Sequence, residues 1–460
     1  MNYYGIDFNV KNVPSLDKEF IPCVAWMKAY SEKATVPFAI AVERNNGRTA
    51  VYDTKIIGTD EAFDADLRYV ERLVKFMLWS KGGFRVTLCG NEKLAAKIKE
   101  IYSLEGDRKF DFDFMSNVYE RTFEVISVPY AEKPEENEHA ESVGKHLDGC
   151  RIGFDAGGSD RKVSAVIDGE PVYSEEVVWF PKTTEDPDYH FNGIVEAFKT
   201  AASKMPRVDG IGVSSAGVYV DNKTMVASLF LKVPKDQFDA KVKDIYIRAA
   251  KEIGDVPLVV ANDGDVSALA GAMSLQAGEV MGMAMGTSEA VGYVDEDGNI
   301  AGWLNELAFA PVDLNEAAME DEWSTDIGVG CKYFSQDAVI KLAPRAGIEL
   351  DETLSLADKL KQVQSLMAED DERAAKVFES IGCYLGHTLP FYAMFYDLSY
   401  LILLGRVTSG KGGDIVLDVC KKVLSEEYPE LAAKLTVMLP DEKIRRVGQS
   451  VAAASLPAIK

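Results

Sequence analysis

The chain has 460 residues, 47% of them hydrophobic, which is enough for two or three domains with sizeable cores. Fifty basic and 74 acidic residues give a net charge of −24, which disfavours nucleic acid or an anionic membrane surface as a partner. No apolar run approaches the roughly 20 residues that span a bilayer. The six cysteines are scattered without a CxxC pair, and no secretory signal is visible. We therefore expect reduced thiols in a cytoplasmic protein.

Residues 1–130 form an N-terminal segment of alternating strand and helix patterns. These patterns predict a hairpin over 37–56 around Asn45-Asn46-Gly47, a helix over 63–80, a strand over 84–90 and a helix over 92–103. The C-terminal region also begins with hairpin, helix and strand. The segment is therefore either a degenerate duplicate of that region or another example of the general α/β pattern. The role of this segment stays open. We assign it no catalysis, because it has no turn like the Asp-x-Gly-Gly sequence at 155–158.

Residues 131–149 are expected to form an acidic linker, because the sequence AEKPEENEHAESVG at 131–144 is polar and poor in large apolar residues. This change of composition separates the N-terminal segment from a region at 150–460. We expect that region to form two lobes, at about 150–265 and 266–460.

The C-terminal region alternates strands and helices, which predicts an α/β fold. In chain order we expect strands at 151–157 and 162–168, a turn at 168–169, a helix at 191–204, a strand at 210–220, a helix at 235–253, a strand at 257–262, a helix at 264–275, a hairpin at 280–302, a largely helical stretch, a strand at 399–404 and a small-residue helix at 447–456.

The stretch at 152–170 predicts two strands joined by a tight turn, called here the first glycine turn. Asp155 stands at its entrance, and Gly157, Gly158 and Ser159 form it. Glycines let the backbone approach a phosphate and point N–H groups at its oxygens. A neighbouring carboxylate can hold Mg²⁺, directly or through water. An ordinary hairpin is the alternative reading.

Asn262 and Asp263 stand where an apolar strand meets a helix. The carboxyl ends of strands are where α/β folds place ligands, and a helix N-terminus favours a carboxylate or a bound anion. An aspartate there could accept a proton from an attacking hydroxyl group. Simple helix capping is the alternative, because Asn and Asp are favoured caps.

Two further loops have the composition of nucleotide contacts. Gly286, Thr287 and Ser288 form a second glycine turn, whose backbone and hydroxyl groups could bind phosphate. Gly405 follows an apolar strand and opens a Gly/Ser loop that could accept a base or a ribose. An ordinary hairpin and an ordinary strand-to-helix loop remain the alternatives. The alanines of the helix at 447–456 would allow close packing beside a loop or a ligand, and core packing is the alternative there.

The order of these motifs resembles the sugar kinase/Hsp70/actin superfamily, and within it the ROK family of sugar kinases and sugar-responsive repressors. The resemblance covers about 150–460. It implies a two-lobed ribonuclease H-like (actin-like ATPase) fold with an extra N-terminal α/β segment. It also implies that the two glycine turns bind phosphate, that Gly405 lies in the adenosine motif, that Asn262 binds sugar hydroxyls, and that Asp263 is the catalytic base.

The sequence also departs from the family pattern. The family's Glu-x-Gly-His element corresponds to Glu306, which is kept as a sugar contact, followed by Ala308 and Phe309. Its three closely spaced zinc cysteines are reduced to Cys331, and Tyr333 replaces a sugar-contacting glutamate. One thiolate without a histidine cannot form a tetrahedral zinc site, so no zinc is expected.

We therefore predict an ATP- and Mg²⁺-dependent kinase that phosphorylates a hydroxyl group of a sugar or polyol, with Asp155 positioning Mg²⁺. A homodimer is a further expectation. One alternative is a non-catalytic sugar or nucleotide sensor on the same fold. A DNA-binding repressor is disfavoured, because residues 1–130 contain no basic recognition helix. Another alternative is a phosphotransferase for a non-sugar acceptor, because Phe309 and Tyr333 favour a less polar or larger molecule.

Overall fold

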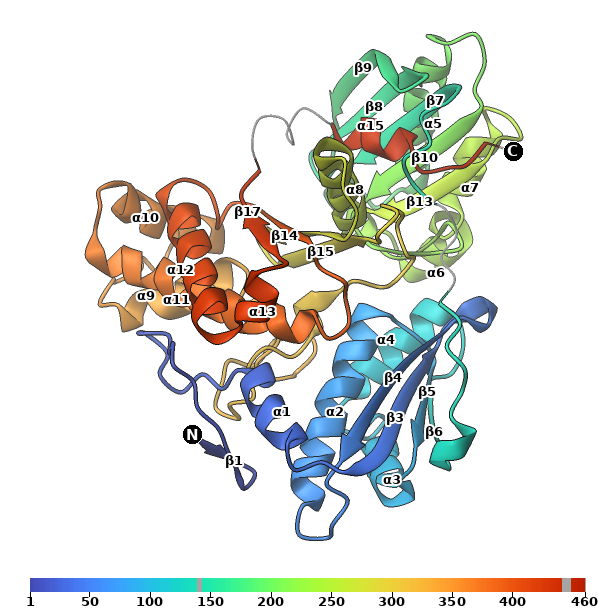
Figure 1. Ribbon diagram of the computed structural model, residues 1–460. Coiled ribbons are helices and arrows are strands. Elements are labelled where there is room, and N and C mark those ends of the chain that lie inside the picture. Colours follow the sequence, from blue (N-terminus) through green and yellow to red (C-terminus); the bar gives the residue numbers. More distant parts are fainter. Residues whose placement is uncertain (139–142, 441–447, 460) are drawn as a thin grey trace. The chain divides into compact units, whose positions relative to one another are not determined.

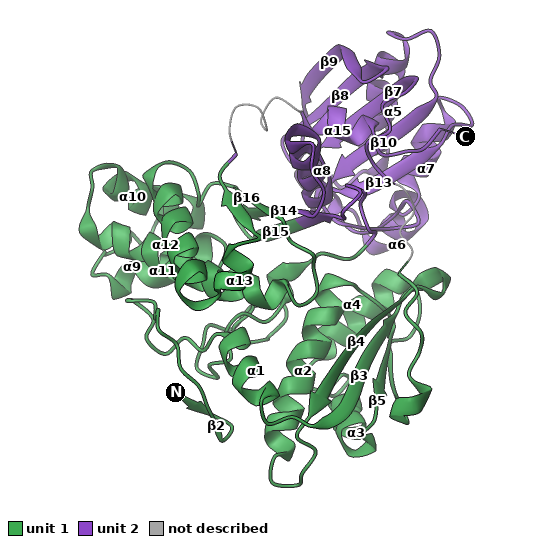
Figure 2. Cartoon of the chain, viewed as in Figure 1, with its two compact units in different colours: residues 1–139, 283–291, 303–439 green, residues 140–282, 292–302, 440–460 purple. Residues whose placement is uncertain are grey.

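The structure, a computed structural model, describes residues 1–138, 143–440 and 448–459. They form two compact units, shown in Figure 2. Unit 1 contains residues 1–139, 283–291 and 303–439, and unit 2 contains residues 140–282, 292–302 and 440–460. The N-terminal segment thus shares a unit with 303–439, and the units have other bounds than the two expected lobes. Residues 139–142 of the expected linker and residue 447 of the expected last helix lie outside the described residues.

Unit 2 is built around a five-stranded sheet with the strand order β13-β10-β7-β8-β9. Its elements are β7 (Cys150–Ala156), β8 (Asp160–Ile167), β9 (Glu170–Val178), α5 (Pro187–Ala202), β10 (Gly210–Ser215), β11 (Val218–Val220), β12 (Lys223–Val226), α6 (Lys235–Gln237), α7 (Ile245–Lys251), β13 (Leu258–Asn262), α8 (Asp263–Leu275) and α15 (Gln449–Ala454). Strands β7, β10 and β13 are parallel to one another, and β7, β8 and β9 are antiparallel.

Helices cover both faces of this sheet (Figure 1). Ile152 and Phe154 of β7 point to one face, where they pack with apolar residues of α5 and α7. Gly153 points to the other face. A Cβ atom there would lie 1.7 Å from the Ser450 carbonyl oxygen, so only glycine lets α15 approach the sheet so closely. The alanine-rich helix therefore packs against the core, which was the alternative reading of its composition.

Two expected elements of unit 2 are interrupted. The strand expected over 210–220 is divided into β10 and β11, because Gly217 adopts a φ of +136° between them and β11 pairs with β12 instead. The helix expected over 235–253 is broken into α6, a π-helical turn at Phe238–Val242, and α7. The Lys243 carbonyl, between the π-helical turn and α7, accepts a hydrogen bond from the Thr224 backbone N–H of β12 at 2.9 Å.

Unit 1 begins with a second α/β layer. The elements of the N-terminal segment are β1 (Asn2–Tyr3), β2 (Ile6–Asp7), α1 (Cys23–Ser31), β3 (Val36–Glu43), β4 (Thr49–Ile56), α2 (Phe63–Ser80), β5 (Arg85–Cys89), α3 (Glu92–Ile101), α4 (Lys109–Tyr119) and β6 (Glu124–Val128). Strands β3 to β6 form a sheet in the order β4-β3-β5-β6, and the predicted hairpin, helices and strand of this segment are all present.

This N-terminal sheet does not repeat the sheet of unit 2. Strand β5 is antiparallel to β3, whereas β10 is parallel to β7. A helical crossover joins parallel strands. In the N-terminal sheet two strands, β3 and β4, precede the helix α2, so β5 runs parallel to β4 and antiparallel to β3. In unit 2 three strands, β7 to β9, precede the helix α5, so β10 runs parallel to β9 and to β7. The strand directions thus favour the general α/β pattern over duplication.

The rest of unit 1 is mainly helical. Its elements are α9 (Gln336–Arg345), α10 (Leu356–Ala368), α11 (Glu372–Tyr392), β16 (Tyr400–Leu404), α12 (Lys411–Glu427), α13 (Pro429–Ala432) and β17 (Thr436–Met438). Strands β16 and β17 continue a four-stranded sheet with the hairpin β14 (Val280–Met285) and β15 (Glu289–Val294), in the order β15-β14-β16-β17. The chain passes between the two units within this hairpin.

All six cysteines are buried and unpaired. None of the described helices combines the length and the apolar composition needed to cross a bilayer.

Candidate functional site

The carboxyl ends of β7, β10 and β13 meet at one edge of the unit 2 sheet, because these strands are parallel. This edge carries Asp155 from β7, Ser214 from β10 and Asn262 from β13, and Asp263 follows directly. The Ser214 hydroxyl donates a hydrogen bond to Oδ1 of Asp155 at 3.1 Å. The structure therefore brings together the aspartates of two motifs that lie more than 100 residues apart in the sequence.

The environment of this edge disfavours the charged forms of both aspartates. Burial raises the pKa of Asp155 to about 6, the negative charge of Asp263 adds to the effect, and the Ser214 hydrogen bond opposes it. Burial also raises the pKa of Asp263, against the Gly264 backbone N–H and the charge of Lys182. Each carboxylate thus becomes a better proton acceptor than an exposed one, and a cation nearby is favourable.

Asn262 is the N-cap of α8. Its Oδ1 accepts a hydrogen bond from the Gly264 backbone N–H at 2.7 Å, and its Nδ2 donates to the Gly217 carbonyl at 2.7 Å. Both ends of the amide are therefore used within the protein. Asn262 fixes the start of α8, and with it the position of Asp263.

The first glycine turn is closely surrounded. A Cβ atom on Gly157 would lie 2.6 Å from the Asp160 carbonyl oxygen, and one on Gly158 would lie 2.6 Å from Cε of Lys182. The indole Nε1 of Trp179 donates to the Gly157 carbonyl at 2.8 Å, which holds the turn from one side. A larger residue at Gly157 would meet backbone, whereas one at Gly158 would meet only the end of the flexible Lys182 side chain. Gly158 and Ser159 are exposed, so the backbone of the turn is accessible.

Lys182 is a candidate that sequence reasoning missed. Its Nζ lies 2.8 Å from the position of a Cβ atom on Gly158, and its charge acts on Asp263. An exposed ammonium group beside a glycine turn is suited to a phosphate. No local pattern marks it, because it follows β9 in the short 3-10 turn Pro181–Thr183 and reaches the glycine turn only in the fold.

In unit 1, the structure brings the second glycine turn and the loop at Gly405 into contact. Gly405 has a φ of +93°, and a Cβ atom there would lie 2.4 Å from the Met285 carbonyl oxygen. The same carbonyl accepts a hydrogen bond from the Val407 backbone N–H at 3.0 Å. Thr287 and Ser288 are exposed at the tip of the turn. The turn and the loop thus form one surface, although about 120 residues separate them.

Glu306 is half-buried, and its backbone N–H donates to the Trp79 carbonyl at 2.9 Å.

Glu289 is a buried carboxyl group near Glu306 that the sequence did not single out. Glu289 directly follows the second glycine turn, and its Oε2 has no hydrogen-bond partner among the described residues. Burial, with a contribution from Glu306, raises the pKa of Glu289 to about 8.

The positions that depart from the family pattern contact the N-terminal segment. The ring centroid of Phe309 lies 4.5 Å from that of Trp79 in α2, and the ring of Tyr333 is 5.9 Å from that of Phe20. Tyr333 is fully buried and donates to Oδ2 of Asp313 at 2.7 Å. Tyr333 is therefore a packing residue, and Phe309 packs on Trp79 while it stays half-buried. The prediction that these two residues favour a less polar or larger acceptor stays a prediction.

A buried ionic network occupies the stretch where the family resemblance implies zinc ligands. Asp326 accepts contacts from Arg72 at 3.1 Å, Lys75 at 3.4 Å and Arg108 at 2.9 Å, all three of which belong to the N-terminal segment. Burial alone would raise the pKa of Asp326, but these three cations lower it to about 2. The Cys331 thiol donates to Asp321 at 3.3 Å. Opposite charges from the N-terminal segment thus stabilise this stretch.

No protein-family model and no curated protein sequence matches the chain. The structure is similar to the ROK hexokinase from Thermus thermophilus, with a TM-score of 0.51 and 16% identity over 66% of this chain and 97% of that one. It is also similar to a ROK family transcriptional regulator, a homologue of the E. coli MLC protein, with a TM-score of 0.50 and 16% identity over 67% of this chain and 79% of that one.

Two thirds of the chain has the ROK fold. The resemblance predicted from the motifs, and with it the two-lobed actin-like ATPase class, is confirmed at the level of the fold. At 16% sequence identity, these two similarities establish the fold alone. Because the ROK fold serves both kinases and regulators, the activity has to be argued from the residues of the site.

Proposed function

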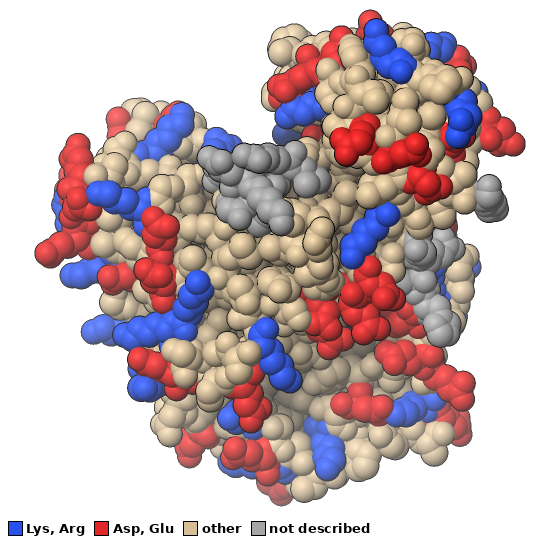
Figure 3. Space-filling view, turned by 45° about the horizontal axis from the view of Figure 1, so that its top comes forward, with Lys and Arg blue, Asp and Glu red and all other residues tan. Residues whose placement is uncertain are grey.

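We propose that the protein is an ATP-dependent phosphotransferase that phosphorylates a hydroxyl group of a sugar or sugar-like molecule. The observation that carries the proposal is the pairing of Asp155 and Asp263 at one sheet edge of unit 2, beside the first glycine turn and Lys182. The fold shared with a hexokinase supports a hexose-like acceptor. The net charge of −24 favours a small molecule over a polyanionic partner, and on the face in Figure 3 the basic side chains are scattered while acidic ones gather in one area.

The first glycine turn and Asp155 fit the phosphates of a nucleotide and their Mg²⁺. A side chain at Gly157 would meet the Asp160 backbone, and Gly158 and Ser159 are exposed, so backbone N–H groups of the turn can face phosphate oxygens. The raised pKa of Asp155 makes a bound cation favourable, and a carboxylate oxygen is the donor that Mg²⁺ prefers. Mg²⁺ would neutralise charge on the phosphates. Lys182 would add a second positive charge from the protein.

Asp263 acts as the general base in this proposal. Its raised pKa favours acceptance of a proton from the attacking hydroxyl group of the acceptor. Asn262 positions it through the two hydrogen bonds of the helix cap. In unit 1, we propose Thr287 and Ser288 as phosphate contacts, Gly405 as an adenosine contact, and Glu306 as a sugar contact.

A sensor on the same fold is the second candidate. Two observations favour it: the similarity to a ROK transcriptional regulator, and the packing roles of Phe309 and Tyr333 in place of the family's polar sugar contacts. A sensor would bind the sugar or the nucleotide without transferring phosphate.

An ADP-release assay with the full chain, ATP and Mg²⁺ over a panel of sugars, amino sugars and polyols separates the two candidates. Turnover with one acceptor, lost on Asp263→Asn, is the expected result. Saturable binding of one sugar without turnover of any would support the sensor instead. A phosphotransferase for a non-sugar acceptor predicts ADP release only with compounds outside this panel.

A further inference from the structure

Unit 1 contains a cavity of about 430 Å³ in the N-terminal segment, remote in sequence from all the motifs described above. Its wall is one face of α2, because Asp64, Leu67, Arg68 and Glu71 follow the helical i, i+3, i+4, i+7 spacing. The other lining residues are Tyr4, Ile101, Asp107 and Arg108. The volume falls within the usual range for small-molecule sites.

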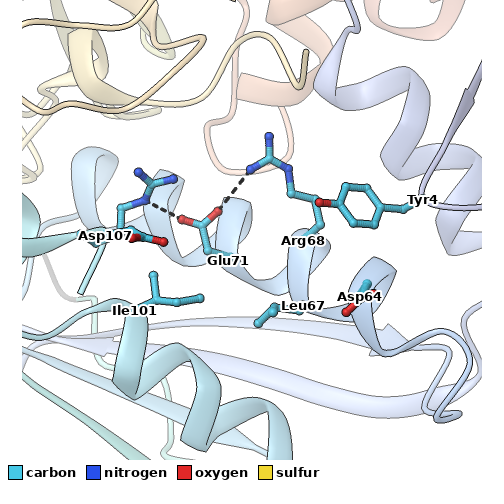
Figure 4. Close-up of a pocket in the computed structure, with 8 residues that line it drawn as sticks. Tyr4, Asp64, Leu67, Arg68, Glu71, Ile101 and Asp107 are labelled. Carbon is cyan, nitrogen blue, oxygen red and sulfur yellow. Dashed lines mark hydrogen bonds and ion pairs between the residues drawn. The ribbon is translucent and has the colours of Figure 1, made fainter. Parts of the chain in front are cut away.

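Figure 4 shows the carboxylate of Glu71 at the floor of this cavity, joined to Arg68. Nε of Arg108 donates to Glu71 at 2.8 Å, and Arg72 holds the same carboxylate at 2.5 and 2.6 Å. Burial alone would raise the pKa of Glu71, but these guanidinium groups hold it well below its usual range. Glu71 is therefore charged, and its oxygens are already used by two other arginines.

Arg68 is the cation of this floor with the weakest pairing. Its Nη1 lies 3.9 Å from the shared Glu71 carboxylate, and its Nη2 donates to the Leu314 carbonyl at 3.2 Å. Its Nε is buried and has no hydrogen-bond partner among the described residues. By contrast, Arg72, Lys75 and Arg108 each have a carboxylate within 3.1 Å. The guanidinium group also lies over the Tyr3 ring, 5.9 Å from its centroid. Each Nη has a further N–H, so Arg68 keeps donor capacity and positive charge for a ligand.

The rim of the cavity has a different character. Asp64 and Asp107 are exposed there, and Tyr4 is 41% exposed. The carboxylates of Asp64 and Asp107 accept hydrogen bonds from hydroxyl groups but repel an anionic group of a ligand. Leu67 and Ile101 add half-buried apolar surface. A ligand would thus need an anionic group at one end and hydroxyl groups at the other.

We propose that this cavity binds a small hydroxylated organic anion, whose phosphate or carboxylate group pairs with Arg68 while its hydroxyl groups face Asp64 and Asp107. A guanidinium group suits both anions, because its planar N–H groups can donate in pairs. The site lies within unit 1 and does not depend on the proposed kinase reaction.

Isothermal titration of the full chain, without ATP, tests this site with two probes. Glucose 6-phosphate supplies a phosphate group and gluconate supplies a carboxylate. Arg68→Gln is expected to raise the dissociation constant at least about tenfold, because a hydrogen bond to a charged group is lost. Arg373→Gln is the matched control, because Arg373 also donates to a backbone carbonyl, that of Gly347, but lies in α11 outside the cavity.

Leu67→Trp fills the cavity without changing its charge and is expected to weaken both probes, so it decides the question if Arg68→Gln fails to fold. Asp263→Asn is expected to leave binding unchanged. Three results would overturn the proposal: no binding of either probe by the wild type at millimolar concentration, equal affinity of wild type and folded cavity variants, or loss of binding on Asp263→Asn alone. The last result would move the anion to the proposed catalytic site.

Discussion

Arg72 and Asp326 form an ion pair inside unit 1, with 3.1 Å between Nη1 and Oδ2 and both side chains shielded from solvent. Arg72 belongs to α2 of the N-terminal segment, and Asp326 lies in the stretch where the ROK pattern implies zinc cysteines. The pair therefore makes the N-terminal segment part of the core of unit 1.

Asp326→Asn is expected to destabilise the protein by about 3–5 kcal/mol, because it leaves the charges of Arg72, Lys75 and Arg108 without this partner in a buried environment. Urea unfolding measures the change. Asp60→Asn removes an exposed partner of Lys93 and is expected to have little effect. Equal midpoints for both variants would show that the network does not stabilise unit 1.

Asp263→Asn is expected to lower kcat by about 10²–10⁴-fold, the usual contribution of a positioned general base. Asparagine keeps an oxygen for the Gly264 backbone N–H but cannot accept the proton. ATP binding, measured by titration, should persist. Asp239→Asn changes an exposed aspartate and serves as the control. Wild-type turnover in Asp263→Asn would remove this residue from its proposed role.

Lys182→Met is expected to raise the KM for ATP by up to about fivefold, because a positive charge is removed from beside the first glycine turn. The same change should move the pKa of Asp263 further upward, because Lys182 opposes its shift. The acid limb of the pH–rate profile would then move to higher pH, which loss of packing alone would not cause. Lys199→Met, at an exposed ion pair of α5, is the control.

Turnover is expected to fall as the pH drops below about 6. Burial raises the pKa of Asp155 to that value, and the pKa of Asp263 is also raised. Both groups act as carboxylates in the proposed mechanism, so protonation in this range removes the Mg²⁺ ligand and the base. A kcat/KM profile from pH 5 to 8 measures this, with circular dichroism to check folding. A flat profile down to pH 5 would contradict the assignment.

Glu289→Gln is expected to stabilise the protein at pH 8 and above. The folded-state pKa of Glu289 is raised from 4.5 to about 8, so the stability present below pH 4.5 is lost as the pH rises to 8. Over that interval the wild type loses up to about 1.4 kcal/mol per pH unit relative to the variant. Thermal melts at pH 5 and pH 8.5 compare the two, and an unchanged difference would show that Glu289 ionises freely in the folded state.

The sequence was most informative where structure depends on neighbouring residues. The stretch around the first glycine turn predicted β7 and β8, and Asn262 was recognised as a candidate cap. The break at Gly217 was missed, because the apolar pattern continues through it and only the pairing of β11 with β12 shows the change of direction. Lys182 and Glu289 were missed for a related reason, since their positions depend on contacts between distant parts of the chain.

The family pattern was informative in a different way. It correctly predicted the fold, but it could not reveal that Phe309, Asp326 and Tyr333 contact the N-terminal segment. Those contacts involve Trp79, Arg72 and Phe20, which no ROK motif includes. Substitutions that look like losses in a motif are here parts of an interface within unit 1.

Helix α15 has a consequence for the synthesis of the protein. Its residues 449–454 pack on β7 and β10, where Gly153 and Gly212 leave room for its backbone, yet residues 283–291 and 303–439 of unit 1 are translated between those strands and this helix. At about 5–20 residues per second, a ribosome needs on the order of ten seconds or more to make that intervening stretch. During this time one face of the sheet lacks its cover, so we expect a nascent chain to need a chaperone at this face until α15 emerges.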